Sequence, residues 1–217
     1  FLKKISKIIF LGLPIENLKN AILTGNPIRE SFIDHKEYLH DDKSVIKIYI
    51  TGGSQGAEYI NKEVPRIFKN LPYDIKIIHQ CGKDNFQEVN NLYSLDRVNA
   101  EISEFFQNPI DKILWSDFVI SRGGALSLSE ITSLKRGIVI IPLPTSIDNH
   151  QVENAKSIEN IKMGIMHEQK SHINQLQEKL KNIIENKIYL DWQNIKNNQH
   201  INASKRIVGH IENYLSK

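Results

Sequence analysis

VIKIYITGGSQGA, residues 45–57, is the stretch that decides the fold of this chain. Its apolar half is typical of a buried strand, and the residues from Glu58 to Asn70 continue with the spacing of a helix. The first N–H groups of a helix have no partner within the helix and carry a partial positive charge, so a strand, a glycine turn and a helix in this order can bind a phosphate. The stretch indicates a nucleotide or nucleotide-sugar binder. A tight strand-to-helix turn that binds no ligand fits the same residues.

The spacing of the glycines narrows the kind of nucleotide. No Gly-Lys-Ser/Thr follows Gly56, so the turn is not a Walker A loop, and Gly52–Gly56 does not match G-x-G-x-x-G. These mismatches disfavour a kinase and a Rossmann dehydrogenase.

Composition excludes several other classes. The chain has 217 residues, 40% hydrophobic and 24% charged, which is enough for one large globular domain or two small ones. A net charge of +3 is too small to indicate nucleic-acid binding. Cys81 is the single cysteine, so no internal disulfide can form and a reducing cytoplasm is expected. No apolar run approaches the roughly 18 residues that span a bilayer.

Strand-like and helix-like segments alternate after residue 45. We expect strands at about 45–51, 74–79, 98–102, 117–121, 137–141 and 164–168, and helices at about 56–70, 85–95, 108–115, 125–135, 149–160 and 171–186. This alternation predicts an α/β, Rossmann-like doubly wound parallel sheet that binds ligands at the carboxyl ends of its strands. The run Lys7–Leu13 predicts one more buried strand. Beyond Lys187 the pattern is helical to the end, with Ile201, Ile207, Ile211 and Leu215 on one apolar face.

A second glycine turn, Arg122–Ala125, follows the strand at 117–121 and opens a helix. Ser127 would lie in its first turn, where the hydroxyl can meet a phosphate or cap the helix. Glu130 lies further along, where its carboxylate can accept hydrogen bonds from a ribose diol or stabilise the helix dipole.

Polar residues also collect at two other predicted strand ends. Asp148–Gln151 open a helix and suit sugar hydroxyls, although a solvated loop capped by Asn149 fits equally. His79–Lys83 end a strand, either near the ligand or in contact with it. No Cys/His spacing predicts zinc and no Asp-x-Asp pair predicts a divalent cation, so helix dipoles and N–H groups must neutralise the anion.

Five motifs together resemble the C-terminal half of the MurG family of bacterial glycosyltransferases, over about residues 20–215. In chain order the motifs are Gly25–Arg29, Gly52–Ala57, His79–Lys83, Arg122–Glu130 and Asn149–Ala155. The resemblance implies the C-terminal domain of a GT-B glycosyltransferase that binds UDP-N-acetylglucosamine. It also implies metal-independent, inverting transfer of N-acetylglucosamine to lipid I, which forms lipid II for peptidoglycan, with no cofactor.

The resemblance further implies how the chain is organised. Residues 1–26 would be a remnant of an N-terminal domain and a linker, 27–200 the donor-binding domain, and 201–217 a C-terminal helix that returns toward the N-terminal domain. Because the sequence lacks an initiator Met, we expect the N-terminal domain to be missing, and the fragment alone to be inactive. That domain would supply the catalytic base, the lipid I site and the contact with the cytoplasmic face of the inner membrane; no nucleic acid is expected.

The resemblance implies a donor site as well. The turns at Ser54 and Ser127 would bind the diphosphate, Glu130 the ribose, backbone groups near Phe106 the uracil, and Gln151 the sugar. The full predicted set is Arg29, Gly53, Ser54, Gln55, Gly56, Phe106, Ala125, Leu126, Ser127, Glu130, His150 and Gln151. Three positions depart from the family pattern: Gly123 stands where Ser is common, Ser127 replaces Thr and Phe106 replaces Ile.

Two alternatives share much of this pattern. One is the donor-binding subunit of a split glycosyltransferase, whose acceptor half is a separate polypeptide. The other is a UDP-N-acetylglucosamine 2-epimerase, which shares the GT-B fold.

Overall fold

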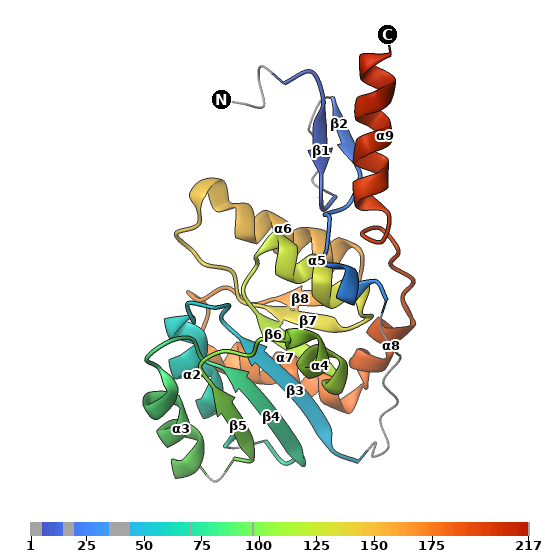
Figure 1. Cartoon of the computed structure of the whole chain (residues 1–217). Coiled ribbons are helices and arrows are strands. Elements are labelled where there is room, and N and C mark those ends of the chain that lie inside the picture. The colour runs from blue at the N-terminus through green and yellow to red at the C-terminus, as the bar shows by residue number, and fades with distance from the viewer. Residues whose placement is uncertain (1–5, 15–19, 35–43, 70, 97, 217) are drawn as a thin grey trace.

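The computed structural model describes residues 6–14, 20–34, 44–69, 71–96 and 98–216, and contains two parallel sheets (Figure 1). The larger has six strands: β3 (Ile46–Thr51), β4 (Ile75–Gln80), β5 (Ala100–Ser103), β6 (Phe118–Ser121), β7 (Gly137–Ile140) and β8 (Gly164–Met166). They lie in the order β5-β4-β3-β6-β7-β8, and every neighbouring pair is parallel. This is the Rossmann strand order, so the predicted fold class is confirmed. The order reverses between β3 and β6, and ligands of such sheets bind outside the carboxyl ends of the strands at that point.

Helices cover both faces of the sheet. On one face α2 (Glu58–Phe68), α3 (Phe86–Leu95), α7 (Ile173–Glu185) and α8 (Ile188–Asn194) bury apolar side chains against Ile48 and Ile50 of β3. On the other face α4 (Pro109–Trp115), α5 (Ala125–Ser133) and α6 (His150–Asn160) pack against Tyr49. Alternation along β3 therefore supplies both cores, as expected for a strand buried on two sides.

Helix ends differ from the sequence-based ranges where the backbone turns left-handed. The first helix begins at Glu58 instead of residue 56, because Gly56 has a φ of 74° and Ala57 is extended. The helix predicted to end at 135 stops at Ser133, and Lys135 has a φ of 56°.

The prediction of continuous helix beyond Lys187 is wrong for one segment. Ile195 is extended and ends α8, and α9 (Ala203–Leu215) begins only after a non-helical stretch. Ile195 packs against both hydrophobic cores, so burial of this side chain competes with helix continuation.

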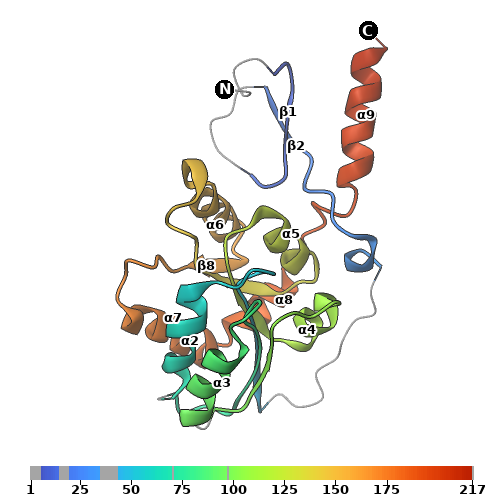
Figure 2. The same cartoon turned by 60° about the vertical axis from the view of Figure 1, so that its left-hand side comes forward.

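A smaller unit stands beside the Rossmann domain. It consists of β1 (Ile9–Leu11), which pairs with β2 (Ala21–Leu23), and of α9. Both views show these three elements projecting from the same side of the domain (Figures 1 and 2). The strand predicted within Lys7–Leu13 is confirmed, but its residues are only partly buried. On α9, Ile211 is 45% exposed and Leu215 77% exposed, so the predicted apolar face lies largely in solvent here.

Two segments, residues 24–26 and 199–206, lie where this unit meets the domain, and we call them the neck. Leu13 and Pro14 also contact the domain: Leu13 is buried in its core, and Ser157 Oγ of α6 donates to the Pro14 carbonyl (2.6 Å). Asn26 N–H donates to His200 Nδ1 (3.1 Å), and Arg206 Nε donates to the Thr24 carbonyl (2.9 Å). Gly25 has a φ of 81°, and a Cβ there would lie 2.2 Å from the Gln199 carbonyl oxygen, so only glycine allows this approach. Asn26 Nδ2 also donates to Ser129 Oγ of α5 (2.8 Å). The neck is thus fastened to the domain at α5.

No helix within the described residues is long and apolar enough to cross a membrane.

Candidate functional site

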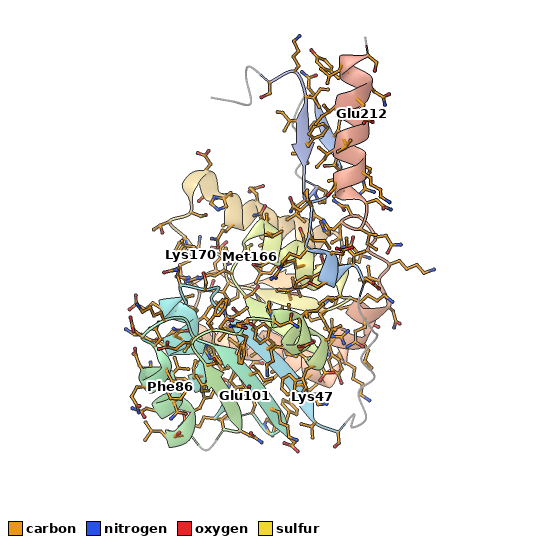
Figure 3. All side chains as sticks on the ribbon, viewed as in Figure 1. Lys47, Phe86, Glu101, Met166, Lys170 and Glu212 are labelled. Atoms are coloured by element: carbon orange, nitrogen blue, oxygen red, sulfur yellow. The ribbon has the colours of Figure 1, made fainter. Side chains whose placement is uncertain are left out.

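A cavity of about 740 Å³ opens at the point where the strand order reverses. Thr51 and Ser121, the last residues of β3 and β6, both line it. In Figure 3, Met166 at the end of β8 marks this carboxyl edge, whereas Lys47 near the start of β3 marks the opposite edge. The cavity lies where the strand order predicts a ligand.

The first glycine turn forms one rim of the cavity. Gly53 N–H donates to Thr51 Oγ1 (3.0 Å) and Gly56 N–H donates to the Gly53 carbonyl (3.1 Å), so these two donors hold the turn itself. Ser54 and Gln55 are exposed at its tip. Asn61 is the first residue of α2 whose N–H reaches a helical partner, the Ala57 carbonyl (2.8 Å). The N–H groups that α2 offers to an anion are therefore those of residues 58–60, slightly later than the sequence suggested.

The second glycine turn faces the first across the cavity. Gly124 is the N-cap of α5, and Leu128 N–H donates to its carbonyl (3.0 Å). The N–H groups of Ala125, Leu126 and Ser127 precede that bond and carry the positive end of the helix dipole. Ser127 is exposed and no side chain caps α5, so the capping alternative for this serine is not observed.

Helix α6 fixes the second turn from behind. Gln151 Oε1 accepts from the N–H groups of Gly123 (3.2 Å) and Leu143 (3.0 Å), and Asn154 Nδ2 donates to the Gly123 carbonyl (2.9 Å). A Cβ on Gly123 would lie 2.5 Å from the Gln151 carbonyl oxygen, so glycine at this position lets α6 approach closely. Gln151 thus lines the cavity while holding its wall.

The start of α6 only partly matches the sequence-based expectation. His150 is exposed and lines neither this cavity nor a smaller one that adjoins it. Asn149 is the N-cap residue, but its side chain makes no capping hydrogen bond, so the capping alternative is not observed.

A second cavity of about 180 Å³ adjoins the first and shares Thr51, Gly53 and Ser127 with it, so the two are ends of one cleft. Phe106 and Glu130 line this smaller end. The cleft therefore brings together both glycine turns and most of the predicted donor-site residues.

Glu130 forms a bidentate ion pair with Arg29 in the smaller end. Arg29 Nε lies 2.8 Å from Oε1 and Nη2 lies 3.0 Å from Oε2, and this hydrogen bonding raises the pKa of Arg29. Glu130 is the sixth residue of α5 and is buried, whereas helix-dipole effects fade within the first turn. Its carboxylate is thus oriented by Arg29, and the helix-dipole alternative fits poorly.

Gln80 is a cleft residue to which sequence reasoning gave no role of its own. Its Nε2 donates to the Gly53 carbonyl (3.2 Å), and its Oε1 accepts from Phe106 N–H (3.0 Å). It therefore joins the first glycine turn to the wall of the smaller end. The sequence signal that could have revealed this role is the position of Gln80 at the end of β4, the strand beside β3.

Gln169 and Tyr59 line the larger end and were not predicted, and Arg122, which also lines it, was named only as part of the second glycine turn. Arg122 Nη1 donates to the Ile141 carbonyl (3.1 Å), and burial lowers the pKa of its guanidinium. The Gln169 side-chain amide faces that guanidinium. The Tyr59 hydroxyl is hydrogen-bonded to His167 Nε2 (3.1 Å). This end thus combines a cation, an amide and a phenol.

Among the residues that the structure describes, no three His, Cys, Asp or Glu side chains are grouped so that they could hold a metal ion.

Comparison with known sequences gives a consistent result. The model of the family described as glycosyltransferase family 28 C-terminal domain matches residues 47–210. Two similar relatives, from Saccharophagus degradans (33% identity over 78% of this chain and 44% of the relative) and from a Wolbachia of Drosophila simulans (35%, 79% and 51%), are both named UDP-N-acetylglucosamine–N-acetylmuramyl-(pentapeptide) pyrophosphoryl-undecaprenol N-acetylglucosamine transferase. The chain spans about half the length of these curated relatives.

Solved structures with the same fold include MurG of Acinetobacter baumannii, with a TM-score of 0.82 and 24% identity over 98% of this chain and 62% of that one. The UDP-GlcNAc 2-epimerase of Neisseria meningitidis has a TM-score of 0.55 and 17% identity over 86% of this chain and 46% of that one. The GT-B fold prediction is therefore confirmed.

Proposed function

Because the chain belongs to the glycosyltransferase family 28 C-terminal domain family, we propose that it is the donor-binding half of a UDP-N-acetylglucosamine-dependent transferase of the MurG type. The enzyme transfers N-acetylglucosamine to lipid I and forms lipid II for peptidoglycan. The names of its relatives support this substrate pair.

The observation that carries the proposal is the pair of glycine turns, each opening a helix, on opposite rims of one cleft. The diphosphate lies between the Gly53–Gly56 turn and the start of α5, where two helix N-termini converge. The nucleoside occupies the smaller end, with the ribose diol at Glu130 and the base beside Phe106. The sugar extends into the larger end toward Gln151.

The arrangement favours departure of the diphosphate. The bond from the anomeric carbon to the β-phosphate oxygen breaks as the acceptor's 4-hydroxyl oxygen bonds to that carbon from the opposite face, which inverts the configuration. The hydroxyl proton passes to a base that we assign to no residue of this chain. Negative charge grows on the departing UDP, and N–H dipoles oriented beforehand stabilise this charge more in the transition state than in the ground state. One such donor contributes about 3 kcal/mol.

The acceptor side completes the proposal. Lipid I and the cytoplasmic face of the inner membrane are contacted through the N-terminal half of the enzyme, and the enzyme is peripheral to the membrane. Neither a metal nor a cofactor takes part.

Calorimetric titration with UDP-N-acetylglucosamine, UDP, ADP and NADH tests the donor assignment. We expect binding of both uridine nucleotides, and weaker or no binding of ADP and NADH. Failure to bind UDP, or a preference for NADH, would contradict it.

Product analysis separates the 2-epimerase alternative. Incubation of the chain with labelled donor and no acceptor should leave the sugar unchanged, and formation of the 2-epimer would establish the epimerase alternative.

A further inference from the structure

A chain of buried polar groups lies behind the first glycine turn, outside the cleft. The Tyr93 hydroxyl lies 2.9 Å from His79 Nδ1, His79 Nε2 lies 3.2 Å from Asn61 Oδ1, and Asn61 Nδ2 donates to the Cys81 carbonyl (2.8 Å). Each of the four residues is at most 2% exposed. The chain links α3, β4 and α2, and ends on the backbone that follows β4.

Only one arrangement of protons satisfies every member. Because the Asn61 amide nitrogen donates to Cys81, its oxygen faces His79 and must accept, so His79 carries its proton on Nε2. Nδ1 is then an acceptor, and the Tyr93 hydroxyl must donate to it. Burial lowers the pKa of His79 to about 3, which keeps the ring neutral. All donors therefore point the same way, toward the Cys81 carbonyl, and such a chain is mutually reinforcing.

The end of this chain touches the first glycine turn directly. A Cβ on Gly56 would lie 2.2 Å from the Cys81 carbonyl oxygen, and a Cβ on Gly82 would lie 2.3 Å from the Gly56 nitrogen. Both glycines have positive φ, 74° and 81°. Residues 81–82 therefore form the rear support of the turn, with no side chain between the two backbones.

Alternation along β4 gives this strand end two tasks. Gln80 points into the cleft and holds Gly53 from the front. His79 points away from the cleft, into the core, and its chain of hydrogen bonds holds the support behind Gly56. The turn is thus fixed from both sides by consecutive residues.

We propose that Asn61, His79 and Tyr93 are positioning residues for the diphosphate: they hold the Cys81–Gly82 backbone so that the Gly53–Gly56 turn keeps the shape that presents the first N–H groups of α2 to the anion. The proposal rests on the proposed function, since it takes that turn as the diphosphate site. None of the three residues lines the cleft.

Tyr93→Phe is the main test, because it removes only the hydroxyl that donates to His79. Ile183→Val is the matched control: it also loosens the same hydrophobic core, from α7, without touching the hydrogen-bonded chain. UDP and uridine are titrated against both variants and the original protein, and melting temperatures are recorded. Two-dimensional NMR follows the Gly56 amide and the ring nitrogens of His79 without ligand.

We expect Tyr93→Phe to weaken UDP binding by at most about fivefold, which corresponds to the whole net contribution of one buried hydrogen bond, and to leave uridine binding unchanged. The Gly56 amide resonance should move in Tyr93→Phe and stay in place in Ile183→Val, even where both lower the melting temperature equally. Asn61→Ala, which removes the last link, should give a larger loss for UDP.

Equal losses for UDP and uridine, or a Gly56 resonance that does not move, would overturn the positioning role. If the original protein binds neither ligand, the proposed function fails instead, and the Gly56 resonance still decides whether the chain supports the turn.

Discussion

Replacing Glu130 with glutamine removes one charge from the smaller end of the cleft while keeping the size of the side chain. A hydrogen bond to a charged acceptor contributes about 1.5–3 kcal/mol, so UDP should bind roughly ten- to a hundredfold more weakly if the carboxylate holds the ribose diol. The bond to Arg29 complicates the change, because glutamine offers the guanidinium only one oxygen. Since the Arg29 side chain is 53% exposed, water screens this pair and its contribution to folding is only about 0–1 kcal/mol.

Calorimetry with UDP and dideoxy-UDP, together with a melting curve for each protein, separates binding from stability. The loss should appear for UDP and be nearly absent for dideoxy-UDP, which lacks the diol. Glu153→Gln is the matched control, because it removes the same charge from α6, where Glu153 pairs only with Lys156 in the described ion pairs. An equal loss for both ligands, or the same loss in the control, would refute the ribose assignment.

Four further outcomes follow from the same geometry. Ser127→Asp should abolish UDP binding, because a carboxylate at the start of α5 repels the diphosphate; retained affinity in calorimetry would argue against that site. UDP binding should survive EDTA with at most a modest loss, whereas a strict need for magnesium or manganese would contradict neutralisation by helix dipoles. The chain alone should transfer no sugar to lipid I, and detectable lipid II would disprove this. The pKa of His79 is lowered to about 3 in the folded state, so below about pH 6.5 this residue binds a proton mainly in the unfolded chain. The free energy of unfolding should therefore fall by up to about 1.4 kcal/mol for each pH unit by which the pH is lowered. In urea titrations at pH 7 and 5, the free energy of unfolding of His79→Phe should fall less than that of the original protein, and an equal fall would count against the assignment.

Local sequence predicted the parts of the fold that depend on local patterns. The apolar run Ile46–Thr51 alternates between two faces, and each glycine turn precedes a helix, so strand, turn and helix follow from neighbouring residues. The same logic placed Ser127 at the cleft.

Interactions between distant residues could not be predicted in this way. Arg29 and Glu130 are 101 positions apart, and Asn26 and His200 are 174 apart, so no periodicity links them. The break at Ile195 likewise depends on two cores that assemble from the whole chain. Gln80 was named only as part of a motif, because the use of its amide depends on where Gly53 and Phe106 lie in space.

The neck has a mechanical consequence for the cleft. A tilt of α9 and the β1–β2 pair about residues 24–26 and 199–206 would leave all the strand pairings of the large sheet intact. The tilt would disturb α5, because Asn26 Nδ2 donates hydrogen bonds to Ser129 Oγ and to the Ala125 carbonyl (3.4 Å). A movement of α9 and the β1–β2 pair would therefore pull on α5 at the helix terminus that faces the cleft.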